Sequence, residues 1–177
     1  ALLALTHIDG SFNEISGCWP TELGCVPELR SCIFTHNKIE ELPYTVGGLT
    51  TLTLLNFSNN RLHHVPESVG NMLSLTNLNL SCNKLVALPE RIGDAQALQH
   101  LDVSANQLVA VPRTIGWLRC IRTLSVFNNR LTSLPAEFGT LIQRLETFSC
   151  GRNPFSDLDT KWSTTWTNAD KYSTVCS

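Results

Sequence analysis

The sequence lacks both a strong excess of charge and a long apolar run. Its 177 residues carry 13 Lys and Arg against 15 Asp and Glu, which gives a formal net charge of −2. A chain this close to neutrality has no bulk electrostatic attraction for nucleic acid or anionic lipid, so we expect neither as a partner. No apolar stretch approaches the roughly 20 residues that a membrane-spanning helix needs, so we expect no membrane insertion.

The sequence also lacks the common motifs of catalysis and metal binding. It contains no G-x-x-x-x-G-K-[ST], G-x-G-x-x-G, G-x-S-x-G or H-E-x-x-H, which are the signatures of phosphate loops, dinucleotide sites, hydrolase nucleophiles and zinc proteases. It has no C-x-x-C and no Cys/His cluster with zinc-finger spacing. We therefore predict no enzyme activity, no catalytic residue, no cofactor and no metal site.

Complete disulfide pairing within the chain is excluded by the seven cysteines, because their number is odd. This favours a reducing compartment, so we predict a cytoplasmic location. Secretion is the alternative, and in that case Cys18 and Cys25, which flank one convex loop, could pair.

What the sequence does have is a repeat of 23 residues. Asn, Pro and Gly each recur at this interval in one common register, which is the signature of a solenoid. The columns are Asn37, Asn60, Asn83, Asn106 and Asn129; Pro43, Pro66, Pro89, Pro112 and Pro135; and Gly47, Gly70, Gly93, Gly116 and Gly139.

One unit of the repeat is L-x-x-L-x-L-x-x-N-x-L-x-x-L-P-x-x-I-G-x-L-x-x. Its L-x-L segment alternates with period two, which predicts a short strand with one buried face. A single strand cannot bury that face alone, so stacked units place their strands side by side, about 4.8 Å apart, in a parallel sheet. Seven units start near Leu5, Leu29, Leu52, Leu75, Leu98, Ile121 and Leu145.

Each invariant residue has a predicted structural role. An Asn side chain offers a donor and an acceptor to backbone groups that are buried where the strand turns inward. Pro has no N–H and a fixed φ, which predicts an extended or polyproline-like return on the convex side. Gly is expected to permit a tight turn back toward the next strand. The sheet side is therefore concave, and the arc has no closed pocket.

This pattern resembles the leucine-rich repeat family over residues 2–158. It is similar to the 23-residue Leu-Pro/Ile-Gly subtype of intracellular Ras-interacting scaffolds and of the Scribble, erbin and densin group. The resemblance implies an α/β solenoid, an arc with a concave parallel β-sheet and an irregular Pro-rich convex side. It also implies a non-enzymatic protein–protein interaction module, a scaffold or signalling adaptor, with small GTPases among the implied partners. The alternatives are the recognition arm of a larger kinase, ligase or phosphatase, and a secreted recognition receptor.

The pattern assigns residues 1–156 to the solenoid and residues 157–177 to a cap or to the start of a following segment. Leu158, Trp162 and Trp166 have the i, i+4, i+8 spacing of one helix face, which predicts a capping helix over 157–172. An irregular eighth unit is the alternative. At the other end, Leu2 matches the last apolar position of a preceding unit, so we expect that end either to be truncated or to be covered by something outside this chain.

The repeat leaves the outward-facing strand positions free to vary, and these predict a partner-binding surface on the concave face. The surface is polar and nearly uncharged, with a few apolar residues that are typical of contact anchors, although scattered surface apolar residues are also normal. The predicted contact residues are Ile33, Leu54, Asn56, Asn77, Asn79, His100, Asp102, Ser125 and Phe127.

Three further features are placed by the same register. Lys38, Arg61, Lys84 and Arg130 follow the Asn column and form a basic edge, which either meets an acidic partner or is simply solvated. His63 and His64 lie one unit after Glu40 and Glu41, which predicts an inter-repeat ion pair, with a metal or catalytic site as the rival. Cys82 takes a variable contact position, whereas Cys32 and Cys150 replace core Leu residues and are expected to be buried thiols.

Overall fold

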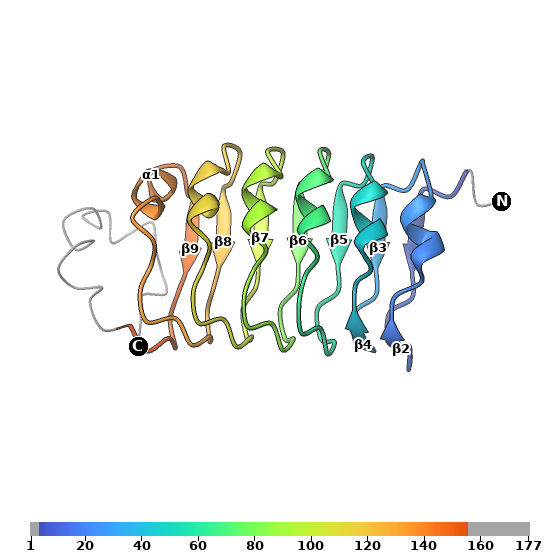
Figure 1. Cartoon of the computed structure of the whole chain (residues 1–177), viewed down its shortest axis with the longest axis horizontal. Helices are drawn as coiled ribbons and strands as arrows, with labels where there is room; N and C mark the ends of the chain where they lie inside the picture. Colours follow the sequence, from blue (N-terminus) through green and yellow to red (C-terminus); the bar gives the residue numbers. More distant parts are fainter. Residues whose placement is uncertain (1–3, 156–177) are drawn as a thin grey trace.

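The structure is a computed structural model that describes residues 4–155 (Figure 1). The predicted capping helix over 157–172, and the segment 157–177 as a whole, lie outside these residues. In the described part, each 23-residue unit makes one turn of a solenoid, and the turns stack along the long axis of the molecule. Strands line one side of the stack and short helices line the other.

Within residues 4–155, one strand from each predicted unit joins a seven-stranded parallel sheet. The central residue of each strand pairs with its equivalent in the next, as in Leu55 with Leu78 and Leu78 with Leu101. This confirms that L-x-L forms the strand. The strands are β1 (His7–Asp9), β3 (Ser31–Ile33), β5 (Leu54–Asn56), β6 (Asn77–Asn79), β7 (His100–Asp102), β8 (Thr123–Ser125) and β9 (Thr147–Ser149).

A second, smaller parallel sheet lies at the N-terminal end. It pairs β2 (Ser16–Cys18) with β4 (Lys38–Glu41) in the segment that follows the Asn position. The register slips between Gly17 and Cys18, where Gly17 has a φ of +74°. No later unit of the described chain forms such strands, and the sequence repeat did not indicate this sheet.

The convex side is more regular than the sequence predicted. The prolines are extended, as predicted: Pro43, Pro66, Pro89 and Pro112 have ψ between 144° and 157°. A 3-10 helix begins directly after each of these prolines. The missing N–H of Pro costs nothing there, because an N–H at the start of a helix has no partner within the helix. The helices are η1 (Thr21–Cys25), η2 (Tyr44–Gly48), η3 (Glu67–Asn71), η4 (Glu90–Asp94), η5 (Arg113–Trp117) and a final α-helix, α1 (Phe138–Ile142).

The predicted role of the Asn column is confirmed in detail at Asn83. Its side-chain nitrogen donates to the carbonyl oxygens of Phe57 at 2.9 Å, Leu80 at 3.0 Å and Ser81 at 3.2 Å. Its side-chain oxygen accepts the N–H of Leu62 at 2.9 Å. Two of these four partners belong to the preceding unit, so the buried amide joins adjacent turns of the solenoid as well as closing its own.

The predicted role of the Gly column was wrong. In the described residues the only glycine with a positive φ is Gly17, which is outside the column. Gly93 is required instead because adjacent 3-10 helices touch there: a Cβ on it would overlap the carbonyl oxygen of Thr114 and lie 2.8 Å from the Thr114 Cβ. The same overlap with the next unit's backbone occurs at Gly47, Gly70 and Gly116.

A conformational demand that the sequence did not reveal precedes every Asn of the column. The residue at this position has a φ between 52° and 57°, a region that Asn tolerates better than most side chains. Cys82 is one of these residues, so the backbone turn determines its conformation. The position accepts different side chains, each at some conformational cost. The full set is Phe12, His36, Asn59, Cys82, Ala105, Asn128 and Arg152.

The core is one continuous apolar stack between the sheet and the helices. Trp19, Phe34 and Phe57 pack together near its N-terminal end, with ring centroids 5.5–5.9 Å apart. Cys32 and Cys150 are buried, as predicted for residues that replace core Leu. Each fully buried Leu or Ile in such a stack contributes roughly 1.5–3 kcal/mol.

Candidate partner-binding trough

The concave sheet carries an open trough of about 350 Å³ that extends over β5 to β9. Its floor is the backbone at the central strand leucines, whose side chains are buried in the core, and its walls are the outward-facing residues on either side. Seven of the nine predicted contact residues line it: Leu54, Asn56, Asn77, Asn79, His100, Asp102 and Ser125. The repeat pattern thus placed these side chains together, because alternation along a strand decides which side chains face outward.

The polar residues at the last position of β5, β6 and β7 are held by their own turns. The side-chain Oδ1 atoms of Asn56, Asn79 and Asp102 accept the N–H of the residue two positions ahead, at 2.9–3.0 Å. This local Asx contact fixes the side chains in place. Within the described chain, the amide nitrogens of Asn56 and Asn79 then donate no hydrogen bond, so they are available to a ligand.

The residues at the first position of these strands form the other wall. Leu54 supplies apolar surface, and the Asn77 side-chain oxygen accepts the Thr76 hydroxyl at 2.8 Å. His100 Nδ1 lies 2.8 Å from the hydroxyl of Thr123 on the next strand. Among the lining residues Asp102 is the single carboxylate, and there is no Lys or Arg. The trough is therefore a polar, weakly acidic surface with preset donors and acceptors.

Several lining residues were not predicted. Thr123, Thr147 and Ser149 extend the trough to its C-terminal end. They occupy the same outward-facing strand positions as the predicted residues, so the alternation was sufficient to find them.

Two predicted contact residues, Ile33 and Phe127, are not among the residues that line the trough. Ile33 belongs to β3, one strand before the trough begins. Phe127 follows the end of β8, where the guanidinium carbon of Arg152 lies 5.3 Å from its ring centroid, within the range of a cation–π contact. Their part in binding a partner stays a prediction for the rim of the surface.

Of the four residues of the predicted basic edge, one forms an ion pair. Lys38 Nζ lies 3.3 Å from a carboxylate oxygen of Glu14. Arg61, Lys84 and Arg130 are exposed and form no ion pair with another described residue. This edge runs along the turns that follow the strands, outside the trough, and its role in binding remains a prediction.

The paired histidines and glutamates meet as the register predicted. His64 Nε2 lies 3.9 Å from the Glu41 carboxylate, and the N–H of His63 donates to the Glu40 carbonyl oxygen at 3.4 Å. No group of three His, Cys, Asp or Glu side chains in residues 4–155 is arranged to hold a metal ion. Over the same residues, the helices are all too short and polar to cross a bilayer.

The thiols divide into buried and exposed groups. Burial raises the pKa of Cys32 to about 12, so its thiolate, the reactive form, is absent at neutral pH. Desolvation, with the nearby charge of Glu41, raises the pKa of Cys18. Cys25, Cys82 and Cys120 are exposed and free.

Comparison with known proteins finds the same repeat and the same fold in leucine-rich repeat proteins. A leucine-rich repeat family model matches residues 50–108 and 73–131. No curated protein sequence matches the chain. Among solved structures, an LRR protein of Leptospira interrogans is 30% identical, with a TM-score of 0.64, over 81% of this chain and 42% of that protein.

Two further structures show the same fold. The Arabidopsis receptor kinase HAESA, in complex with the peptide hormone IDA and the co-receptor SERK1, is 28% identical over 82% of this chain and 25% of that one, with a TM-score of 0.74. An internalin of Listeria monocytogenes is 22% identical over 88% and 44%, with a TM-score of 0.75. The chain spans less than half the length of each of these three proteins. The family model, the seven-stranded sheet and these likenesses show that the chain has the leucine-rich repeat fold and support its place in the leucine-rich repeat family.

Proposed function

We propose that this leucine-rich repeat module, which is a protein–protein interaction domain, binds an extended segment of a partner protein in its concave trough. The observation that carries the proposal is the trough itself, where fixed side chains leave donors and acceptors without partners. Five strands at the usual spacing of about 4.8 Å span about 19 Å, the length of roughly six extended residues. A peptide crossing the strands meets Asn56, Asn79 and Asp102 in turn.

The charge in the trough favours one class of segment. Asp102 is the sole carboxylate in the lining, and one of its oxygens is used by the Ser104 N–H. A Lys or Arg of the partner, placed beside the other oxygen, makes a charge-assisted hydrogen bond. Neighbouring polar groups of the partner pair with the Asn56 and Asn79 amides.

We further propose that the module acts as a non-enzymatic scaffold or signalling adaptor in the cytoplasm. The odd number of cysteines and the exposed free thiols of Cys25, Cys82 and Cys120 support this setting. The Leu-Pro/Ile-Gly unit also resembles that of Ras-interacting and Scribble-like scaffolds, which makes a small GTPase or another signalling protein the first partner class to test.

A second candidate is a peptide-recognising arm of a larger receptor or enzyme. The likeness to the HAESA receptor kinase, whose structure contains a peptide hormone, favours it, and the chain spans only 25% of that protein. The trough serves either role, because both require recognition of an extended segment. The two candidates differ in compartment and in what is attached to the module.

A single Ser125→Arg substitution is expected to abolish partner binding. Ser125 lines the trough, and its hydroxyl makes no hydrogen bond with another described residue, so a long cationic side chain fills the trough without removing a contact. The amount of partner captured from native lysate, quantified by mass spectrometry, should fall at least about tenfold, because the arginine side chain clashes with a segment bound in the trough and repels its cations. The melting temperature should not change. Ser133→Arg on an exposed loop is the matched control. Equal capture by both variants would remove the trough as the binding site.

Thiol titration separates the two proposed settings. In denaturant, protein from its native source should show all seven thiols if the compartment is reducing, whereas two or more protected thiols would favour the secreted candidate.

In the native state, Cys82 and Cys120 should react with iodoacetamide at pH 8. Burial raises the pKa of Cys32 to about 12, so its labelling should stay negligible as pH rises through the ordinary thiol range and should begin only near that value.

A further inference from the structure

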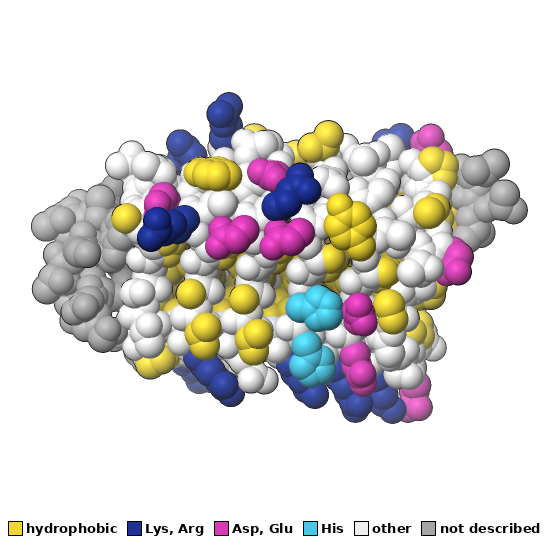
Figure 2. Space-filling model, viewed as in Figure 1, with side chains coloured by type: hydrophobic (Ala, Val, Ile, Leu, Met, Phe, Trp, Pro, Cys, Tyr) yellow, Lys and Arg dark blue, Asp and Glu magenta, His cyan; other side chains and the backbone are white. Residues whose placement is uncertain are grey.

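A second hollow, of about 480 Å³, lies away from the trough at the outer ends of η4, η5 and α1. None of its lining residues lines the trough. Figure 2 shows Lys and Arg side chains projecting near this end of the helix row, beside large hydrophobic side chains. The lining residues are Gly93, Asp94, Gln96, Gly116, Trp117, Arg119 and Arg144.

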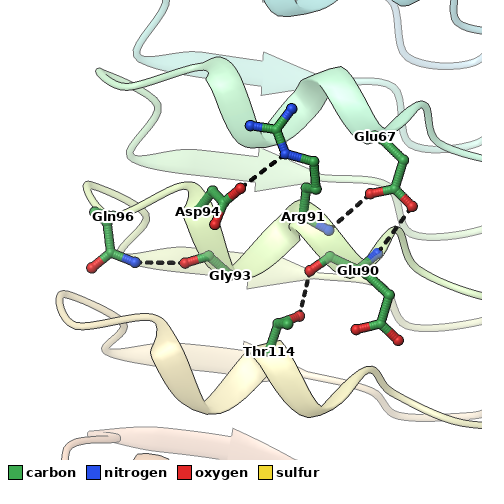
Figure 3. A network of polar contacts seen from close by, with 7 residues as sticks. All are labelled: Glu67, Glu90, Arg91, Gly93, Asp94, Gln96 and Thr114. Atoms are coloured by element: carbon green, nitrogen blue, oxygen red, sulfur yellow. Dashed lines mark hydrogen bonds and ion pairs between the residues drawn. The ribbon is translucent and has the colours of Figure 1, made fainter.

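The hollow is held open by contacts of the chain itself. The Gln96 side-chain nitrogen donates to the carbonyl oxygens of Gly93 and Trp117, and so ties the loop after η4 to the end of η5. Figure 3 shows Gln96 reaching back to Gly93 at the end of η4. Adjacent helices are already in backbone contact at Gly93. The surface is therefore preformed, which lowers the entropy that a ligand loses on binding.

Helix η4 is fixed on the other side by its neighbours. The carboxylate of Glu67 accepts the N–H of Glu90 at 3.2 Å and of Arg91 at 2.8 Å, at the start of the helix. The hydroxyl of Thr114 donates to the Glu90 carbonyl oxygen. Figure 3 shows these contacts joining three successive units. The wall of the hollow that η4 provides is thus rigid.

Two guanidinium groups at the hollow lack a carboxylate partner. Arg119 and Arg144 are exposed, and neither forms an ion pair within residues 4–155. The one acidic residue in the lining, Asp94, is already engaged by Arg91, whose Nε lies 2.9 Å from its carboxylate (Figure 3). The hollow is therefore a positive spot on a chain whose net charge is −2.

An exposed indole completes the hollow. Trp117 is 58% exposed although it ends a helix of the packed convex side. Trp and Arg are the residues most enriched among those that dominate binding energy at protein interfaces. A flat apolar surface beside two planar cations suits a ligand in which an apolar group lies next to an anionic one.

We propose that this hollow is a second binding site, which takes an acidic peptide segment with an aromatic or aliphatic residue beside Asp or Glu. The carboxylates pair with Arg119 and Arg144 in the bidentate geometry that guanidinium favours. The apolar residue packs on Trp117. The site has the opposite charge preference to the trough, so the two surfaces recognise different segments, and this proposal stands whether or not the trough binds a partner.

The test is an NMR titration of the whole chain with the peptide acetyl-Glu-Phe-Glu-Leu-Glu-amide. Amide signals of residues 93–96 and 116–119 should shift, and those of the trough should not. The double variant Arg119→Glu, Arg144→Glu should bind at least about tenfold more weakly, because it turns attraction into like-charge repulsion. Trp117→Ala should also weaken binding. Arg113→Glu, which reverses an exposed charge outside the hollow, and Ser125→Arg in the trough are the controls and should bind within about twofold of the unmodified chain.

Several results would overturn the proposal. The peptide acetyl-Lys-Phe-Lys-Leu-Lys-amide binding equally well would exclude charge recognition. Inorganic phosphate binding as tightly as the acidic peptide would reduce the hollow to a simple anion site. A thymidine dinucleotide binding more tightly would assign it to nucleic acid. An unchanged affinity of the double arginine variant would place the peptide elsewhere.

Discussion

Replacing Gly93 by Ala is expected to destabilise the solenoid by about 3 kcal/mol, at the upper end of the usual cost of overpacking. The added methyl group would overlap the carbonyl oxygen of Thr114 in the next unit. That oxygen belongs to the backbone of a helix that is packed against its neighbours, so it cannot move aside as a flexible side chain would. Urea unfolding followed by circular dichroism measures the loss, provided that the transition of the array remains cooperative.

Gly17→Ala is the matched control, because it makes the same chemical change for a different reason. Gly17 has a φ of +74° but nothing within 4 Å of the position of an added Cβ. Its replacement should cost only the penalty of about 1–2 kcal/mol for a left-handed backbone. If Gly93→Ala were no more destabilising than Gly17→Ala, adjacent helices would have room between them, and the close approach could not be the reason for the Gly column.

The second large effect is expected at Asn83. Asn83→Ala removes three donated hydrogen bonds and one accepted hydrogen bond. It leaves the buried N–H of Leu62 unsatisfied, whereas the Phe57 carbonyl oxygen still accepts the Asn60 side-chain amide at 3.1 Å. The unsatisfied N–H costs about 1–3 kcal/mol and the lost hydrogen bonds to carbonyl oxygens add to this, so we expect a total loss of roughly 3 kcal/mol. Denaturation in urea at constant pH provides the measurement.

The control for this prediction is Asn71→Ala. Asn71 ends η3, and its side chain makes no hydrogen bond with another described residue. Its replacement should change the free energy of unfolding by no more than about 0.5 kcal/mol, as for ordinary surface positions. Equal effects at the two positions would mean that the Asn column does not carry the turns.

The candidate trough shows how far the repeat pattern predicts a site. Alternation along the strand determines that Asn77 and Asn79 face outward while Leu78 faces the core, and the structure agrees. The pattern does not determine where the sheet is hollowed. Ile33 and Phe127 therefore looked equivalent to the other candidates although they lie outside the trough.

The sequence did not indicate the second hollow. Asp94 and Trp117 occupy one position of the repeat in successive units, as do Gln96 and Arg119, but the residue type changes from unit to unit, so neither column stands out. Arg144 ends a unit that is one residue longer and belongs to neither column. These side chains share a surface because the ends of the helices lie side by side, which only the stacking of the units brings about.

The sequence by itself determined the repeating unit, its length and the parallel direction of its strands. A 23-residue period with L-x-L and a buried Asn allows few folds, because a one-faced strand must stack on its copies to bury that face and a buried turn must satisfy its backbone. The tertiary structure decided what depends on contacts between units. The convex segments became 3-10 helices, the glycines serve close approach, and the residue before each Asn takes a left-handed turn. Spacing along the chain does not encode such contacts, since they arise only when one unit is placed against the next.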